Sequence, residues 1–475
     1  VYKRQELNRP LVLVTDRTDH ALTLLEELKL WAPDVWQMLF PEPNPLFYEN
    51  VSWGESTRRD RLLVLTTLAS YHIPGAAPPT PAPMIITPAR ALMTRSMPRA
   101  DFLRATRMIR LGQSVNLDQL LHTWVALGYQ PVSTVIAPGE FARRGGILDL
   151  WPTAEPQPVR IELFGDEIET LRHFDPVTQR TLRKKRTARQ SGDNIEKLYI
   201  SPAREYLLPL DLAPPPEELH HSSDQQQFSE FNLPQLHRSE TCLLDYLPPD
   251  SLVMIDNVAI AEDFVNEVEE QAVQMRQDYI QQGVLDENFP VPYVSWSEII
   301  DLLAGFQVLE LGPVSANLDP LDPGSGYDGG NGTGVESRLA DRFASGPRFG
   351  GRLKLVMEHM LERYRGGDPQ VIVSRQAARL KELWEEQPLQ AENTVGQLRY
   401  QPGFIDGSLS EGWTFRTLKG QDLHLLTDGE IFGWLSPKPR YRRSERYKIA
   451  VEDPESAFSD LESGDYVGHV DYGIG

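Results

Sequence analysis

The chain has 475 residues and a formal net charge of −21, with 40% hydrophobic and 24% charged residues, and this length predicts about three or four domains. The acidic balance argues against a protein that coats nucleic acid broadly, because phosphate binding needs a basic surface, so any DNA contact would be local. The single cysteine excludes an internal disulfide and favours a reducing compartment, and no apolar run reaches the roughly 18 residues that a membrane-spanning helix needs.

The first segment predicts a layer of parallel strands and helices. "LVLVTD" (11–16) is a continuous apolar run typical of a buried parallel strand, and "HALTLLEELKLW" (20–31) places leucines at helical spacing. A second strand–helix pair is suggested by "DRLLVLTTLASY" followed by "PMIITPARALMTR". This alternation predicts an α/β domain that begins with residues 1–102.

From about residue 103 the pattern changes to short β runs with tight turns. "ILDLW", "VRIELF" and "EIETLRHF" are typical of strands, and "FGDE" (164–167) is a hairpin-turn candidate. We therefore predict a small antiparallel β-rich domain over residues 103–190, inserted into the α/β domain, which resumes over residues 191–312. The basic "RKKRTAR" (183–189) is either a solvated loop or a phosphate contact, and the sequence leaves both open.

The remainder predicts a linker and a second small α/β domain. Residues 313–345 are rich in Gly, Asp and Pro and are predicted to be a flexible linker. The α/β pattern returns over residues 346–437, where "PQVIVS" is predicted to be a strand ending at Ser374, a good N-cap for the next helix. "DLHLLTDGEIFGW" supplies another strand, and residues 438–462 are predicted to be an exposed connector.

Motifs for catalysis or cofactor binding are missing from the sequence. No G-x-x-x-x-G-K-[ST] run occurs, and the first strand ends in "TDRTDH" without a glycine, so the α/β layer has no loop to hold nucleotide phosphates. The ten His residues show no metal-ligand spacing, and no G-x-S-x-G motif is present. The sequence therefore predicts a binding protein with no catalytic residues, no metal and no cofactor of its own.

One stretch concentrates positive charge within this acidic chain. "GEFARRGGILDLWPTAEPQPVRIELFGDEIETLRHFDPVTQR" begins at Gly139 and carries five of its arginines in or beside predicted strands. Residues 141–190 contain ten Lys and Arg against seven Asp and Glu, a local balance of +3. Such a focal patch predicts an acidic partner for this segment.

Side-chain alternation in "VRIELF" suggests which residues would meet that partner. Its Val, Ile and Leu would face the core, leaving Arg160, Glu162 and Phe164 on the outer face, which Arg144 could join from a preceding strand. An exposed Phe beside an Arg has little folding rationale, and both residue types are enriched at the centres of protein interfaces. The alternative is that Phe164 packs under the turn at 165–167 and the arginines are solvated, and residue types alone leave both open.

The same stretch closely resembles the module shared by the excision-repair protein UvrB and the bacterial transcription–repair coupling factors (the Mfd family). In both, an "RG" run leads through apolar residues and an Asp to a Pro. An "R-apolar-[DE]-apolar-F" run follows, and then "DEI-x-[ST]-apolar-R-x-FD-x-x-[ST]QR". This sequence matches them with "RGGILDLWP", "RIELF" and "DEIETLRHFDPVTQR".

Three features make the coupling factors the better match. UvrB carries a P-loop and an aromatic DNA-clamping hairpin, and neither is visible here. "LFPEPNPLFYENVSWGESTRRDRLLVL" (39–65) is similar to a coupling-factor pattern. "SGDYVGHVDYGIG" (463–475) looks like the opening of their RNA-polymerase-interacting, CarD-like domain, although Gly468 stands where a second Val is more usual. The resemblance covers essentially the whole chain, which opens on Val1 rather than Met and is therefore expected to be the N-terminal part of a coupling factor.

The resemblance implies an α/β multidomain fold. Its first domain would be a P-loop-NTPase-like parallel α/β layer without a Walker A motif, interrupted by a UvrB-type domain at 103–190. A flexible linker and a second small α/β domain would follow. Only the first residues of the polymerase-interacting domain would be present at 463–475, so we expect this chain not to bind the polymerase β subunit.

The resemblance also implies a function and a site. The family recognises RNA polymerase stalled at a lesion, displaces it with an ATP-driven DNA translocase, and recruits UvrA through the UvrB-type module. The family residues of the UvrA contact map onto Arg144, Arg160 and Phe164, with Arg144 preferred to Arg143 because Gly145 follows it. ATP and Mg²⁺, and most DNA contact, would belong to a motor that this chain lacks, and the location would be the bacterial cytoplasm.

Two other functions remain as alternatives. A UvrB-type DNA-binding subunit of excision repair would need a P-loop and a basic DNA path, and neither is visible in the sequence. A nucleotide-dependent enzyme in residues 1–312 has no motif to support it. Binding of ATP by the chain separates both alternatives from an adaptor that recruits UvrA.

Overall fold

The structure of the chain, a computed structural model, describes residues 9–76, 78–182, 195–208, 228–311, 342–387, 400–417 and 420–434, together with backbone strands β18 (Gly468–His469) and β19 (Gly473–Ile474). Contacts divide the chain into two compact units: residues 1–100 with 228–441, and residues 101–227 with 442–475. None of the helices in the described ranges has the length and apolarity that a bilayer crossing requires.

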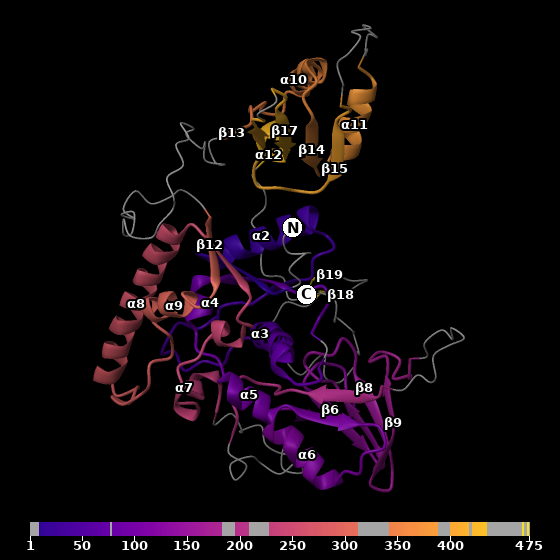
Figure 1. Cartoon of the computed structure of the whole chain (residues 1–475), viewed down its shortest axis with the longest axis vertical. Helices are drawn as coiled ribbons and strands as arrows, with labels where there is room; N and C mark the ends of the chain where they lie inside the picture. Colours follow the sequence, from indigo (N-terminus) through magenta and orange to yellow (C-terminus); the bar gives the residue numbers. More distant parts are fainter. Residues whose placement is uncertain are drawn as a thin grey trace, which may run out of the picture. The chain divides into compact units, whose positions relative to one another are not determined.

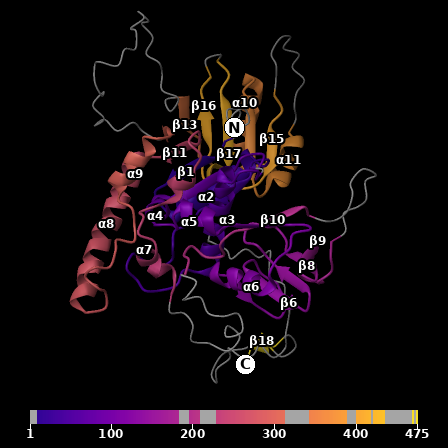
Figure 2. The same ribbon diagram turned by 60° about the horizontal axis from the view of Figure 1, so that its bottom comes forward.

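A five-stranded parallel sheet in the first unit has the order β12-β11-β1-β3-β2. Its strands are Leu11–Thr15 (β1), Gln37–Leu39 (β2), Met84–Pro88 (β3), Leu252–Asp256 (β11) and Gln307–Leu311 (β12). The apolar run predicted as the first strand is β1, and every residue of it is buried, as expected of a central parallel strand. Because β1 pairs with β11, segments far apart in the sequence lie side by side (Figure 2).

Helices connect these strands (Figure 1). They are Thr18–Trp31 (α2), Glu55–Ala69 (α3), Ala89–Met93 (α4), Leu233–Leu236 (α7), Val258–Gln281 (α8) and Trp296–Leu303 (α9). The second predicted strand–helix pair has the reverse order: "DRLLVLTTLASY" lies largely in α3, and the strand is β3 in the segment after it. In α3, Leu62, Leu65 and Leu68 recur every third residue and are buried, as in a helix. A short apolar run such as this one does not by itself distinguish a strand from a buried helix.

A second sheet in the same unit has the order β13-β16-β17-β14-β15. Its strands are Phe343–Ser345 (β13), Gln370–Ser374 (β14), Gly403–Asp406 (β15), Trp413–Phe415 (β16) and Leu423–Thr427 (β17), and its helices are Leu353–Gly366 (α10), Ala377–Glu385 (α11) and Asp428–Phe432 (α12). The linker predicted over 313–345 is too long at its end, because β13 pairs with β16. Residues 312–341 of that segment, the basic loop 183–189 and the connector 438–462 lie outside the described residues.

The predicted N-cap of α11 is wrong. The helix begins at Ala377 after Gln376, whose side chain makes no capping hydrogen bond. The hydroxyl of Ser374 bonds the buried Asp428 carboxylate and accepts a hydrogen bond from the backbone N–H of Gln376 at 2.9 Å. Ser374 is thus drawn into a pair with the start of α12, a contact across 54 residues that local spacing does not reveal.

Two histidines of this second sheet predict a pH dependence. His424 is 5% exposed, its ring lies 6.0 Å from that of His359, and burial lowers the pKa of both. The folded rings therefore bind protons less readily than those of the unfolded chain, where His pKa values are about 6.5, so the unfolded chain takes up more protons on acidification. Stability from this source is complete above about pH 6.5 and is lost as pH falls below it.

We expect the sheet that contains β14 and β17 to open more readily at pH 5.5 than at pH 7.5. Hydrogen exchange of its peptides in the whole chain would show faster exchange on acidification. A His359→Gln, His424→Gln variant should lose most of that difference, because its side chains do not titrate in this range. An unchanged pH response in the variant would assign the effect to other groups.

The second unit contains the predicted β-rich domain. Its strands are Arg107–Arg110 (β4), Gln130–Pro131 (β5), Glu140–Arg144 (β6), Ile147–Leu150 (β7), Val159–Phe164 (β8), Glu167–His173 (β9) and Lys197–Ile200 (β10). Its helices are Arg99–Ala105 (α5) and Leu117–Ala126 (α6), and α5 runs across the domain boundary predicted between residues 102 and 103. Strands β5 to β9 form one sheet in chain order, antiparallel from β6 onward. The predicted end of this domain at residue 190 is too early, because β10 pairs with β4 and Leu198 joins the core of this unit.

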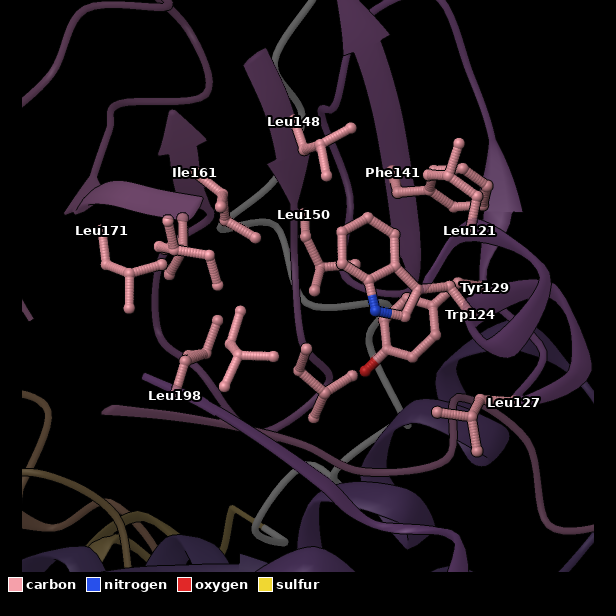
Figure 3. Close-up of a cluster of buried hydrophobic side chains, with 14 of the residues drawn as sticks. Leu121, Trp124, Leu127, Tyr129, Phe141, Leu148, Leu150, Ile161, Leu171 and Leu198 are labelled. Carbon is pink, nitrogen blue, oxygen red and sulfur yellow. The ribbon is translucent and has the colours of Figure 1, made fainter. Parts of the chain in front are cut away.

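The core of the second unit lies between α6 and one face of that sheet (Figure 3). Trp124 of α6 is fully buried and meets the ring of Phe141 edge-on, with centroids 5.5 Å apart. Val159 and Ile161 are buried on the same face, and Leu163 packs against this core, so the predicted core side of "VRIELF" is confirmed. With that face filled, Arg160 and Phe164 are left on the opposite side, the outer face.

Candidate functional site

Two hairpin turns lie at the same end of the β6–β9 sheet. Gly145–Gly146 connects the paired residues Arg144 and Ile147, and Gly165–Asp166 connects the pair Phe164 and Glu167. The first glycine of each turn has φ near +60°, 64° at Gly145 and 62° at Gly165, as two-residue hairpins of the type with glycine first require. The N–H of Leu163 donates to the carbonyl of Gly146 at 2.9 Å, which ties the two hairpins together.

Phe164 is the most exposed large apolar side chain described, at 79%. It stands at the end of β8, directly before the left-handed Gly165. The alternative in which it packs under the turn at 165–167 is therefore wrong. A large aromatic ring left in water contributes little to folding, and aromatic side chains are enriched at the centres of protein interfaces.

Arg144 lies across the same end of the sheet. Its guanidinium Nη2 donates to the carbonyl of Ser133 and to the hydroxyl of Thr134, both at 3.2 Å, and the side chain is exposed. These neutral partners hold the guanidinium without neutralising its charge. The neighbouring Arg143 is on the core side of β6 and approaches Asp118 of α6 at 3.8 Å. The strand thus separates the two arginines, and Arg144 is the one that shares a face with Phe164.

Arg160 occupies a different setting. Its Nε and Nη2 donate to the two carboxylate oxygens of Asp149 at 2.7 and 2.8 Å, and Asp149 is only 1% exposed. Its Nη1 donates to the carbonyl of Gln179 at 3.2 Å, and its guanidinium lies 4.7 Å from the ring centroid of Phe174. The hydrogen bonds to Asp149 raise the pKa of Arg160, so this cation is paired within the fold.

The loop from Asp175 to Gln179 supplies one of the partners of Arg160. The carboxylate of Asp175 accepts from the N–H of Val177 and from the hydroxyl of Thr178, each at 2.9 Å. Gln179 has a left-handed φ of 57°, and its side-chain amide donates to the carbonyls of Val135 and Pro176 at 3.1 and 2.7 Å. These bonds fix the position of the Gln179 carbonyl, which accepts the hydrogen bond from Arg160.

Sequence reasoning placed Glu162 on the outer face but missed two other members of it, Ile147 and Asp149. Ile147 is 37% exposed and lies directly between Arg144 and Glu162 across the strands. Glu162 accepts a hydrogen bond from Thr170 at 2.8 Å. Alternation in "ILDLW" could have placed Ile147 and Asp149 on one side of a strand, but matching that side to β8 needs the register of the hairpins.

The outer face thus presents Phe164, Ile147 and Arg144 at the turn end of the sheet, with the paired Arg160 nearer the start of β8. Nothing in this set is a nucleophile or an acid–base pair, because Asp149 is committed to Arg160. In the ranges that the structure describes, no three His, Cys, Asp or Glu side chains are placed to hold a metal ion. The chemistry available is recognition of a partner with an apolar depression beside carboxylates.

The carboxyl edge of the parallel sheet in the first unit was the other candidate. Ligands of such sheets bind outside the strand ends, but here His20 bridges two carboxylates, at 2.9 Å from Asp16 and 3.2 Å from Asp256. Negative charge at the ends of β1 and β11 opposes phosphate binding.

Comparisons with known proteins find a domain and a group of relatives to which the chain is similar. Residues 108–206 match the UvrB interaction domain. Over 99% of its length the chain is 24% identical to the transcription-repair-coupling factor of Bacillus subtilis and 27% identical to that of Myxococcus xanthus. The transcription-repair-coupling factor of Staphylococcus aureus is 23% identical over 100% of the chain. The chain spans 40% of the length of each of these relatives.

Proposed function

We propose, from the premise that this chain is a homologue of transcription-repair-coupling factors and carries a UvrB interaction domain, that its outer face recruits UvrA. The observation that carries the proposal is Phe164, 79% exposed on the face that also presents Arg144, inside the matched domain. Aromatic and arginine side chains are enriched at the centres of protein interfaces. The chain then acts as an adaptor that links stalled transcription to excision repair.

The expected partner surface follows from the charges. Arg144 offers a cation whose present partners are neutral, so an acidic group on UvrA gains a charge-assisted hydrogen bond there. Phe164 needs an apolar depression next to that group. The remaining partners, RNA polymerase and DNA, and the ATP and Mg²⁺ of a motor, would act through parts of a coupling factor beyond this chain.

The first test is binding of the whole chain to UvrA from the same organism. We expect a complex with a dissociation constant in the micromolar range or tighter, formed without added nucleotide on the adaptor side. Isothermal titration with the folded chain measures it directly. If the folded chain does not bind UvrA at all, the proposed function is wrong.

We also propose that the adaptor neither binds nor hydrolyses a nucleotide. The five-stranded parallel layer would be a P-loop-NTPase-like layer whose phosphate site has been lost, with the Asp16–His20–Asp256 bridge at the strand ends in support. The similarity to bacterial coupling factors would also place the chain in the bacterial cytoplasm. A UvrB-type DNA-binding subunit and a nucleotide-dependent enzyme are the competing functions, and both require a nucleotide site.

We therefore expect no ATP binding at micromolar concentrations. A fluorescent ATP analogue titrated with the chain and Mg²⁺ should show no saturable change, because carboxylates at the strand ends repel phosphate and no G-x-x-x-x-G-K-[ST] motif is present. Full-length coupling factor from the same source is the positive control. Saturable micromolar binding by this chain would favour the competing functions.

A further inference from the structure

The setting of Arg160 suggests how the outer face is kept ready for a partner. A guanidinium has five N–H donors in a planar fork. Three of those of Arg160 are engaged among the described residues: Nε and one on Nη2 with Asp149, and one on Nη1 with Gln179. One N–H on each Nη has no partner among the described residues, and this remaining pair, the free fork, can donate to a second carboxylate.

These contacts also restrict the conformations that the Arg160 side chain can adopt. Asp149 holds one edge of the guanidinium, the Gln179 carbonyl holds another, and the ring of Phe174 lies 4.7 Å from its centre. A free arginine loses rotamer entropy when it is immobilised in an interface, whereas one already immobilised does not lose it again.

We infer that Asp149 is a positioning residue for UvrA recruitment, which holds Arg160 so that its free fork receives a carboxylate of the partner. The inference rests on the proposed function. Asp149 itself, 1% exposed, does not touch the partner and acts only through Arg160. The Gln179 carbonyl also holds Arg160, so the loop after Phe174 would contribute to recognition without touching the partner.

Two single variants test the two halves of this inference. Asp149→Asn keeps the shape but replaces one acceptor oxygen by an amide that opposes Nη2, so UvrA affinity should fall about ten- to a hundredfold. Arg160→Lys keeps a cation beside the buried carboxylate but removes the fork, and it should weaken binding by a similar factor. If Arg160→Lys binds UvrA as the unaltered chain does, the fork is not used and the inference is wrong.

A double-mutant cycle separates positioning from a second, independent contact. If Asp149 acts only through Arg160, the Asp149→Asn, Arg160→Ala variant should bind UvrA no more weakly than Arg160→Ala alone. Losses that multiply would contradict the inference. Near-UV circular dichroism of each variant reports whether the β-rich unit keeps its packing, so that affinities are compared only among folded chains.

A measurement without the partner covers the case in which Asp149→Asn fails to fold. The Nε–H of Arg160 should give a resolved nitrogen–proton resonance with slow solvent exchange in the unaltered chain, assigned by its absence in Arg160→Lys. Fast exchange in the folded, unaltered chain would show that the side chain is not held, and would overturn the inference. If UvrA binding depends on Phe164 but not on Arg160 or Asp149, the proposed function stands and this inference fails.

Discussion

Phe164→Ala is expected to weaken UvrA binding by about 30- to 1,000-fold, which corresponds to roughly 2–4 kcal/mol, while the stability of the chain changes by no more than about 0.5 kcal/mol. The two effects separate because the ring is 79% exposed and contributes to a partner's pocket rather than to the core. Isothermal titration with UvrA measures the first effect and hydrogen exchange of the β8–β9 hairpin measures the second. No other single substitution on the outer face is expected to have so large an effect on affinity alone.

Two matched variants sharpen this result. Val284→Ala removes an apolar side chain that is 69% exposed in the other unit, and it should leave UvrA affinity unchanged. Arg144→Ala removes an exposed cation of the same face whose bonds to Ser133 and Thr134 are neutral, so a smaller loss is expected, chiefly in the salt-dependent part of binding. If Phe164→Ala binds as tightly as Val284→Ala, the recruiting surface lies elsewhere in the matched domain.

Arg160→Ala is a poorer probe of recognition than Arg144→Ala. Its removal leaves the buried Asp149 carboxylate without a counter-charge, which is expected to cost about 3–5 kcal/mol of stability. A loss of UvrA binding in that variant would mix unfolding with lost contact. The combination of Phe164→Ala with Arg144→Ala removes the two exposed groups and leaves the Asp149–Arg160 pair intact.

Trp124→Ala is expected to destabilise the β-rich unit by about 3–5 kcal/mol, whereas Trp124→Phe should cost less than about 1.5 kcal/mol. The indole is fully buried between α6 and the sheet and meets Phe141 edge-on (Figure 3), so its deletion leaves a large cavity. Its Nε1 has no hydrogen-bond partner among the described residues, so the phenyl ring loses volume but no polar contact.

Hydrogen exchange resolved by peptide is the appropriate measurement, because a chain with two units does not unfold in one step. Peptides of β7 and β8 should lose protection in Trp124→Ala and keep it in Trp124→Phe. Peptides of β1 and β11 serve as the internal control, since the parallel sheet has its own core. Equal losses in both variants would mean that the indole N–H is satisfied and that packing volume is not the main contribution.

Much of the fold could be predicted because the decisive patterns are local. "LVLVTD" is a strand, "FGDE" is a hairpin turn and the apolar residues of "VRIELF" face the core, since a strand's alternation needs only its own residues. The errors occurred where a contact is distant in sequence. Ser374 is held by Asp428, β13 joins β16, and β10 returns to β4 after the boundary placed at residue 190.

The sequence by itself determined the family-like strings, the absence of a phosphate loop and the outward side of Phe164, because each depends on neighbouring residues alone. Only the tertiary structure decided that Arg144 has neutral partners whereas Arg160 is paired with a buried carboxylate. The register of β7 against β8 brings the Asp149 carboxylate to Arg160, and the loop after Phe174 returns the Gln179 carbonyl to the same guanidinium. Such pairings combine residues from separate strands, and their energies depend on burial, which no local pattern specifies.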